Sequence, residues 1–156
     1  MRVPGAWSFA RFGLEEMNSP LKQVAALPIV ETAEGPLVLL ITTRGRGRWT
    51  IPRGWPKPDM ADADLAVQEA AEEAGVEGDI EPERLGSFEY TKRFHLFSWA
   101  KCRVDVYALR VRYQHLDWPE KAARKTLWVP PEEAASLVAD DELSALLSDF
   151  FRQKAA

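Results

Sequence analysis

The sequence predicts an α/β sandwich built on a mixed β-sheet, and three observations support this fold class. Segments typical of strands and of helices alternate along 156 residues, a length that suits one domain with its own core. Two apolar stretches, "QVAALPIVE" and "GPLVLLITTR", lie on either side of a turn at Gly35 and Pro36 and predict a hairpin. The run "DADLAVQEAAEEAG" is rich in helix formers and predicts a central helix. No repeat or linker divides the chain, so we expect one domain over residues 21–153, after a poorly patterned segment over residues 1–20.

The remaining elements follow from the same patterns. A glycine-rich connection, "RGRGR", leads into a short extended piece, "WTIP". The segments "LGSFEYTKRF" and "AKCRVDVYALRVRY" carry the alternation and the β-branched or aromatic residues of strands, and we expect them to pair. "HLDWPEKAARKTLWV" predicts a loop and then a strand, and Pro130 and Pro131 introduce a helix, "EEAASLVA". Apolar residues at helical spacing in "DELSALLSDFFRQ" predict a closing amphipathic helix.

Composition narrows the class of protein. A formal net charge of −4 disfavours stable binding to nucleic acid or to an anionic membrane, so any phosphate site must be local. The longest apolar stretch, "PLVLLI", is too short to span a bilayer. A single cysteine and an N-terminus without a secretory apolar core predict a reducing, cytoplasmic setting. The oligomeric state stays open.

The central helix is expected to carry three carboxylates on one face. Asp62 can serve as its N-cap and Gly75 as its C′ residue, and Glu69, Glu72 and Glu73 fall within an arc of about 100°. A solvated acidic face is one interpretation. A cation site is the other, because no Lys or Arg on this helix relieves a repulsion of about 0.2 to 0.5 kcal/mol per pair, and Mg²⁺ or Mn²⁺ prefers carboxylate oxygens. The opposite, buried face is expected to hold Ala63, Val67, Ala70, Ala71 and Ala74.

Basic side chains gather just before this helix. Arg44, Arg46, Arg48, Arg53 and Lys57 precede it, and no Lys or Arg follows from residue 58 to residue 83. Arginine's planar fork suits phosphate oxygens, and lysine supplies a point charge. This segregation predicts an anionic substrate held beside a cation. For Arg44 and Arg46 a solvated hairpin tip is an equal alternative.

Other candidate side chains carry weaker signals. Trp49 and Trp55 can stack on a base or pack at the rim of the core, and we favour packing for Trp49. His95 and His115 lack partners at ligand spacing, so a zinc site is not supported. Cys102 has no recognisable catalytic partner and is interpreted as structural.

The helix and its flanks resemble the Nudix hydrolase family. The Nudix box, G-x5-E-x7-R-E-U-x-E-E-x-G-U, begins here at Gly54, and its later part matches Glu69, Glu72, Glu73 and Gly75, then Val76. "RWTIPRGWP", "WPE" and "LWVPPEEA" resemble the flanks found in diphosphoinositol polyphosphate and diadenosine polyphosphate hydrolases. The resemblance covers roughly residues 21–151. It implies an α/β/α Nudix-type sandwich around a central mixed β-sheet.

Three box positions depart from the family pattern. The first glutamate is Met60, the arginine is Gln68, and Ala70 is smaller than the usual aliphatic residue. In the family the arginine helps to hold the box carboxylates. Losing both members of an ion pair costs far less than losing one. We therefore expect a different set of contacts around the surviving carboxylates.

The resemblance implies a hydrolase that uses Mg²⁺ or Mn²⁺ to cleave a diphosphate linkage in a nucleotide derivative or related polyphosphate. Dinucleoside polyphosphates are the first expected substrates, and diphosphoinositol polyphosphates the second. A catalytically weak Nudix domain that acts as a nucleotide-binding sensor or interaction module is the alternative. The expected metal ligands are Glu69, Glu72 and Glu73, with Glu72 or Glu73 also catalytic, Arg53, Gly54, Lys57 and Arg48 binding substrate, and Glu120 as an additional metal or base candidate.

Overall fold

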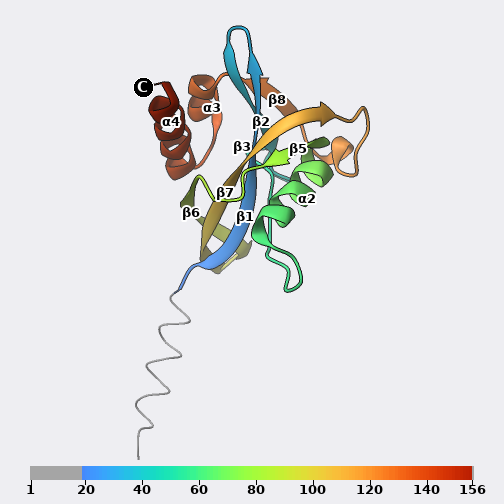
Figure 1. Cartoon of the computed structure of the whole chain (residues 1–156). Helices are drawn as coiled ribbons and strands as arrows, with labels where there is room; N and C mark the ends of the chain where they lie inside the picture. The colour runs from blue at the N-terminus through green and yellow to red at the C-terminus, as the bar shows by residue number, and fades with distance from the viewer. Residues whose placement is uncertain (1–18, 156) are drawn as a thin grey trace, which may run out of the picture.

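The computed structural model describes residues 19–155, so most of the expected N-terminal segment lies outside the described residues. The fold is a mixed sheet with helices on both faces (Figure 1). None of the described helices is long and apolar enough to cross a membrane. The strands are β1 (Leu21–Thr32), β2 (Gly35–Thr42), β3 (Trp49–Thr50), β4 (Arg53–Gly54), β5 (Val76–Ile80), β6 (Gly86–His95), β7 (Ser98–Gln114) and β8 (Thr126–Val129). The helices are α2 (Asp62–Ala74), η1 (Lys121–Ala123), α3 (Pro131–Leu137) and α4 (Asp141–Ala155).

The sheet is mixed, as predicted. Its main path runs β3-β2-β1-β7-β5, with β4 paired to β1, β6 to β7 and β8 to β2. β1 and β7 pair in parallel, from Leu21 opposite Cys102 to Ile29 opposite Arg110, and the other pairs are antiparallel. The β1–β2 and β6–β7 hairpins confirm the sequence prediction. β5 was not predicted, because "VEGDI" is short and its register shifts beside Gly78, where a β-carbon would collide with the Arg110 carbonyl oxygen.

The two faces of the sheet bury two separate cores. Alternation along β1 places Ala25 and Leu27 in the core under α3 and α4, and Val24 and Ala26 in the core under α2. Leu143 and Leu147 of α4 pack on the first core, and Leu65, Ala66, Ala70 and Ala74 of α2 pack on the second. This is the α/β/α sandwich expected from the resemblance.

The ends of α2 agree only partly with prediction. Gly75 terminates the helix at φ 69°, and its N–H donates to the carbonyls of Ala70 and Ala71, as expected of a C′ glycine. The N-cap, however, is Ala61. Asp62 lies in the first turn and forms an ion pair with Lys22, so the prediction of an Asp62 cap was wrong.

The buried face of α2 also differs from prediction. Ala70 and Ala74 are buried as expected, but Ala63, Val67 and Ala71 are only half-buried. Leu65 and Ala66 take their place in the core. Glu73, assigned from helical spacing to the acidic outer face, is buried at 6% exposure. The helix is therefore rotated so that part of the carboxylate face turns inward.

Candidate active site

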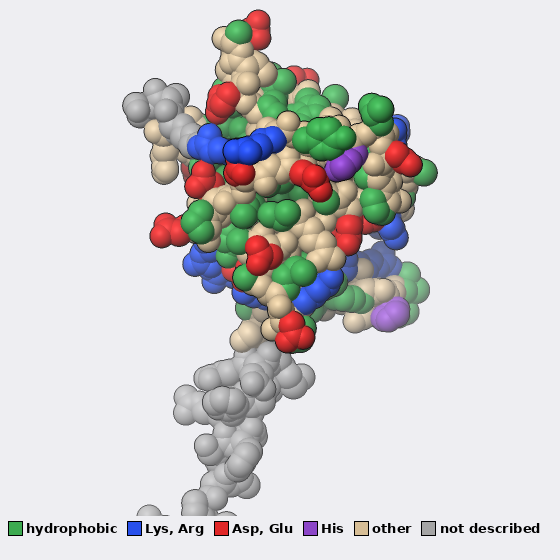
Figure 2. Space-filling model, turned by 45° about the vertical axis from the view of Figure 1, so that its right-hand side comes forward, with side chains coloured by type: hydrophobic (Ala, Val, Ile, Leu, Met, Phe, Trp, Pro, Cys, Tyr) green, Lys and Arg blue, Asp and Glu red, His purple; other side chains and the backbone are tan. Residues whose placement is uncertain are grey.

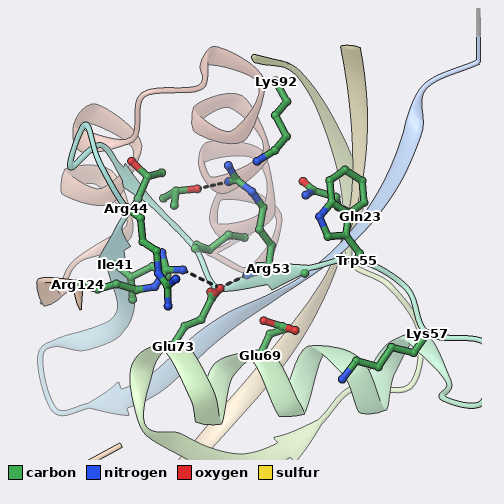
Figure 3. Close-up of a pocket in the computed structure, with 14 residues that line it drawn as sticks. Gln23, Ile41, Arg44, Arg53, Trp55, Lys57, Glu69, Glu73, Lys92 and Arg124 are labelled. Atoms are coloured by element: carbon green, nitrogen blue, oxygen red, sulfur yellow. Dashed lines mark hydrogen bonds and ion pairs between the residues drawn. The ribbon is translucent and has the colours of Figure 1, made fainter. Parts of the chain in front are cut away.

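A cavity of about 490 Å³ lies where α2 meets the β2, β3 and β4 ends of the sheet (Figure 3). The short β4 strand fixes one side of it, because Arg53 and Gly54 pair with Ala25 and Val24 of β1. The acidic side chains come from α2, and the basic ones come from β4, from β6 and from loops. The lining is Gln23, Ile41, Thr43, Arg44, Thr50, Ile51, Arg53, Gly54, Trp55, Lys57, Glu69, Glu73, Lys92 and Arg124.

Glu73 is the innermost carboxylate of this cavity. Its Oε1 accepts a hydrogen bond from Arg124 Nη2 at 3.1 Å, and its Oε2 accepts one from the Arg53 backbone N–H at 3.1 Å. Burial raises the pKa of Glu73 to about 7, against the lowering effects of Arg124 and of the Arg53 N–H. Removal from water outweighs the ion pair, so Glu73 exchanges its proton near neutral pH.

Glu69 and Glu72 occupy more open positions. Glu69 lines the cavity beside Gly54, where a β-carbon would collide with the Glu69 carboxylate, so glycine permits this approach. Burial, followed by the charge of Glu72, raises the pKa of Glu69. Glu72 accepts a hydrogen bond from Gln68 Nε2 at 2.9 Å and lies outside the cavity lining. The structure thus places two of the three predicted carboxylates in one cavity and the third beside it.

Arg124 is the residue that sequence reasoning missed. Its side chain is 12% exposed, and its Nη2 lies 3.1 Å from Glu73 Oε1 and 3.2 Å from Glu120 Oε1. Its Nη1 also donates to the Thr42 carbonyl at 3.0 Å. The available signal was the four-residue spacing from Glu120 to Arg124. The pairing with Glu73, across 51 positions, left no mark in the local sequence.

Glu120 connects the loop before β8 to α2. Its carboxylate pairs with both Arg44 and Arg124, and its backbone N–H donates to the Glu72 carbonyl at 3.1 Å. The structure therefore brings this additional metal or base candidate to the site, and surrounds it with two guanidinium groups.

The predicted basic residues divide between two cavities. Arg53 and Lys57 line the carboxylate cavity, where Arg53 Nη1 donates to Thr50 Oγ1 at 2.6 Å. Arg46 and Arg48 line a second cavity of about 550 Å³. Thr43, Arg44, Thr50, Arg53 and Lys92 line both cavities. Figure 2 shows Lys and Arg side chains along the lower edge of this face and also at its upper left, with Asp and Glu side chains between them.

The remaining candidates are placed as follows. Trp49 is half-buried and packs against the core under α3 and α4, as predicted, whereas Trp55 is 43% exposed. Cys102 is a buried free thiol, consistent with a structural role. His115 lies 3.4 Å from Glu77 and away from the cavities.

Comparison with known proteins identifies the family. The sequence profile of the NUDIX domain matches residues 21–150. The chain belongs to the Nudix family. Two Nudix-box positions that depart from the family pattern make defined contacts in the structure. Met60 packs against the core under α2, and Gln68 donates a hydrogen bond to Glu72.

Individual relatives agree with this assignment. Nudix hydrolase 12, mitochondrial, of Arabidopsis thaliana is 29% identical over 118 residues, 74% of this chain and 58% of the relative. The chain thus spans less than two thirds of that protein. Diphosphoinositol polyphosphate phosphohydrolase 3-alpha of Homo sapiens is 31% identical over 119 residues, 75% of this chain and 68% of the relative. A C. elegans Ap4A hydrolase structure shares the fold, with a TM-score of 0.65 at 18% identity over 86% of this chain and 98% of that one.

Proposed function

We propose that this Nudix domain is a metal-dependent hydrolase that cleaves a diphosphate linkage in a nucleotide derivative or related polyphosphate. One observation carries the proposal: Glu69 and Glu73 line the same cavity as the basic side chains of Arg53, Lys57 and Arg124. Such a cavity can hold phosphate oxygens on its basic side and a cation on its acidic side.

The carboxylates fit a divalent cation that arrives together with a phosphate. Among residues 19–155, no three His, Cys, Asp or Glu side chains converge into a metal-binding group by themselves. Mg²⁺ usually takes one or two carboxylates, and substrate phosphates and waters complete its octahedron. Glu69 and Glu73 supply that number, and Glu72 adjoins them. When bound, the metal lowers the pKa of a bound water and neutralises phosphate charge.

The chain's own residues take the following roles in this proposal. Glu69, Glu72 and Glu73 hold the cation, and Glu72 or Glu73 accepts the proton of the attacking water. The substrate is bound by Arg53, Lys57 and Arg48, and Gly54 leaves room for Glu69 beside it. Because two arginines already hold Glu120, we assign it to positioning them.

The test is a substrate panel in which metal is varied. Dinucleoside polyphosphates, diphosphoinositol polyphosphates and nucleoside diphosphate derivatives are incubated with Mg²⁺, with Mn²⁺ and with EDTA, and products are resolved by ion-exchange chromatography. We expect cleavage at a phosphoanhydride bond with either metal and none in EDTA.

A catalytically weak binding domain is the rival function. Met60 and Gln68 at two box positions, and the pairing of Glu73 with Arg124, favour it. Tight binding of a panel member without turnover at any Mg²⁺ or Mn²⁺ concentration would support the rival and overturn the hydrolase proposal.

A further inference from the structure

A cluster of exposed apolar side chains stands at the turn between β6 and β7. Leu96, Phe97 and Trp99 are 65%, 84% and 57% exposed, and every residue from 93 to 99 is exposed. Large apolar side chains are normally withdrawn from water, so three neighbouring ones left in it indicate a contact surface. We call Leu96, Phe97 and Trp99 the hairpin tip. Phe94 is not included, because its ring stacks on that of Trp55.

The two strands that carry the hairpin tip are basic. Residues 90–104 contain no Asp or Glu and four Lys or Arg side chains, which are Lys92, Arg93, Lys101 and Arg103. The Arg93 guanidinium carbon lies 5.7 Å from the Trp99 ring centroid, and Arg93 Nη2 donates to the Leu96 carbonyl at 3.0 Å. The acidic partners in this hairpin, Glu89 and Asp105, lie at its base. Positive charge therefore accompanies the apolar tip.

The hairpin tip lies at the end of the sheet where β1 begins (Figure 1). Cys102 of β7 stands opposite both Leu21, the first residue of β1, and Tyr90 of β6. The sequence that precedes β1 has the same aromatic and basic composition. Residues 1–14, which lie outside the described residues, contain one Trp, two Phe and two Arg, and no Asp or Glu.

The net charge of the chain does not oppose an anionic partner at this end. The value of −4 describes the whole chain, whereas charges act over a Debye length of only about 8 Å at physiological ionic strength. Arg46 and Arg48 line the second cavity together with Arg93 and Trp99, so the basic surface continues beyond the hairpin. The expectation drawn from net charge therefore does not apply to this local surface.

We propose that the hairpin tip inserts into the interfacial region of an anionic lipid bilayer. Trp and Phe side chains are suited to the boundary between headgroups and acyl chains, and Lys and Arg side chains bind anionic headgroups while their stems cover apolar surface. A folded protein partner would need a groove that matches this protruding tip, whereas a bilayer accepts the tip without a matching shape. The inference goes beyond the proposed function and does not depend on it.

Co-sedimentation of the full chain with vesicles tests the site without substrate or metal. The vesicles contain phosphatidylcholine alone, or two parts phosphatidylcholine to one part phosphatidylserine, at about 0.1 M and at about 0.5 M salt. The variants are the double substitution Leu96→Ser with Phe97→Ser, the conservative Phe97→Trp, and Lys101→Gln. Circular dichroism and thermal unfolding establish that each variant is folded.

Two matched controls lie far from the hairpin tip. Leu116→Ser replaces an apolar side chain that is 90% exposed in the loop before η1. Arg112→Gln replaces an arginine whose side chain is 76% exposed near the opposite end of β7. These controls separate an effect of the tip from a general effect of exposed apolar or basic residues.

We expect the wild-type protein to bind the mixed vesicles about tenfold more tightly than phosphatidylcholine alone, and to lose this preference at the higher salt concentration. The double tip variant should bind the mixed vesicles about tenfold more weakly or worse, because two large apolar side chains are lost. Lys101→Gln should weaken binding about fivefold. Phe97→Trp should retain binding, and both controls should match wild type.

Three results would overturn the membrane site: equal binding to both kinds of vesicle, no sedimentation with either, or losses in the two controls as large as those in the tip variants. A concentration-dependent dimer in analytical ultracentrifugation, abolished by the double tip variant and found without vesicle binding, would assign the tip to a second copy of the chain and also overturn the proposal. Failure of the hydrolase assay would not bear on these results, because the vesicle assay contains neither substrate nor metal.

Discussion

Glu72 and Glu73 are neighbours on one helix, yet their surroundings differ in kind. Glu73 is buried, lies beside the Arg124 guanidinium and has a pKa raised to about 7. Glu72 is half-buried and held by the neutral amide of Gln68. Two adjacent residues of α2 thus differ in what holds their carboxylates: the charged guanidinium group of Arg124 holds Glu73, and the neutral amide of Gln68 holds Glu72. The buried part of the site around Glu73 is therefore coupled to the stability of the fold, whereas the more open part around Glu72 tolerates substitution.

The largest expected effect on stability is that of replacing Arg124. Arg124→Met should lower the free energy of unfolding by about 3 kcal/mol or more at pH 8, because it leaves buried Glu73 without its cation. Arg44 also pairs with Glu120, but its side chain is 65% exposed. Arg44→Met should therefore lower the free energy of unfolding by less than about 1 kcal/mol. Urea denaturation of both variants makes the comparison. Equal losses would show that burial does not distinguish the two arginines.

The next largest effect is on turnover at Glu73. Glu73→Gln removes a charge from the proposed metal site, and we expect a loss of about a hundredfold in kcat, since metal-assisted stabilisation is worth several kcal/mol. Glu72→Gln should lose less, because Glu72 lies outside the cavity lining. Turnover is measured across a Mg²⁺ titration. Near wild-type rates for Glu73→Gln at every concentration would exclude Glu73 from the site.

The raised pKa of Glu73 predicts a pH dependence of stability. The folded state binds this proton up to about pH 7, whereas the unfolded state releases it near pH 4.5. The folded protein therefore holds more protons between these values, and unfolding free energy should fall by roughly 2 to 3 kcal/mol as pH rises through that window. The measurement is the difference between wild type and Glu73→Gln in EDTA from pH 5 to 8.5. A flat difference would mean that Arg124 cancels the cost of burial.

The smallest expected effect concerns the outer end of the site. Met60→Glu alone should not raise activity, because it replaces an apolar contact with the core under α2 and adds charge near an acidic face. Combined with Gln68→Arg, it should perform better than the sum of the two single changes, with a coupling of about 0.5 kcal/mol or more. A double-mutant cycle in turnover and stability measures this. Strictly additive effects of the two substitutions would contradict the explanation that a glutamate and an arginine at these positions act as an ion pair.

Local patterns predicted most of the fold and part of the site. The apolar runs of β1 and β2, the alternation in β7 and the helix signals around Gly75 depend on neighbouring residues, and the predictions based on them were confirmed. The burial of Glu73 was not predictable in this way. It depends on how α2 rotates against the sheet and on Arg124, which β8 and its preceding loop bring from the far end of the sequence. The prediction that Asp62 caps the helix was wrong for the same reason, because its carboxylate pairs with Lys22 of β1, which is distant in the sequence.

The parallel pairing of β1 with β7 sets the order in which the molecule can assemble. Leu21 to Ile29 find their partners only in the strand from Cys102 to Arg110, so the central seam is a contact between distant parts of the chain. Closing such a long loop is entropically costly before the contacts compensate, and folds dominated by non-local pairing form slowly. During synthesis, the edge of β1 that pairs with β7 stays uncovered until β7 has left the ribosome. Arg53 and Gly54, which pair with the opposite edge of β1, follow that hairpin closely in the chain, whereas Arg124 is synthesised only after β7. The carboxylates of α2 are therefore synthesised before the guanidinium group that pairs with Glu73.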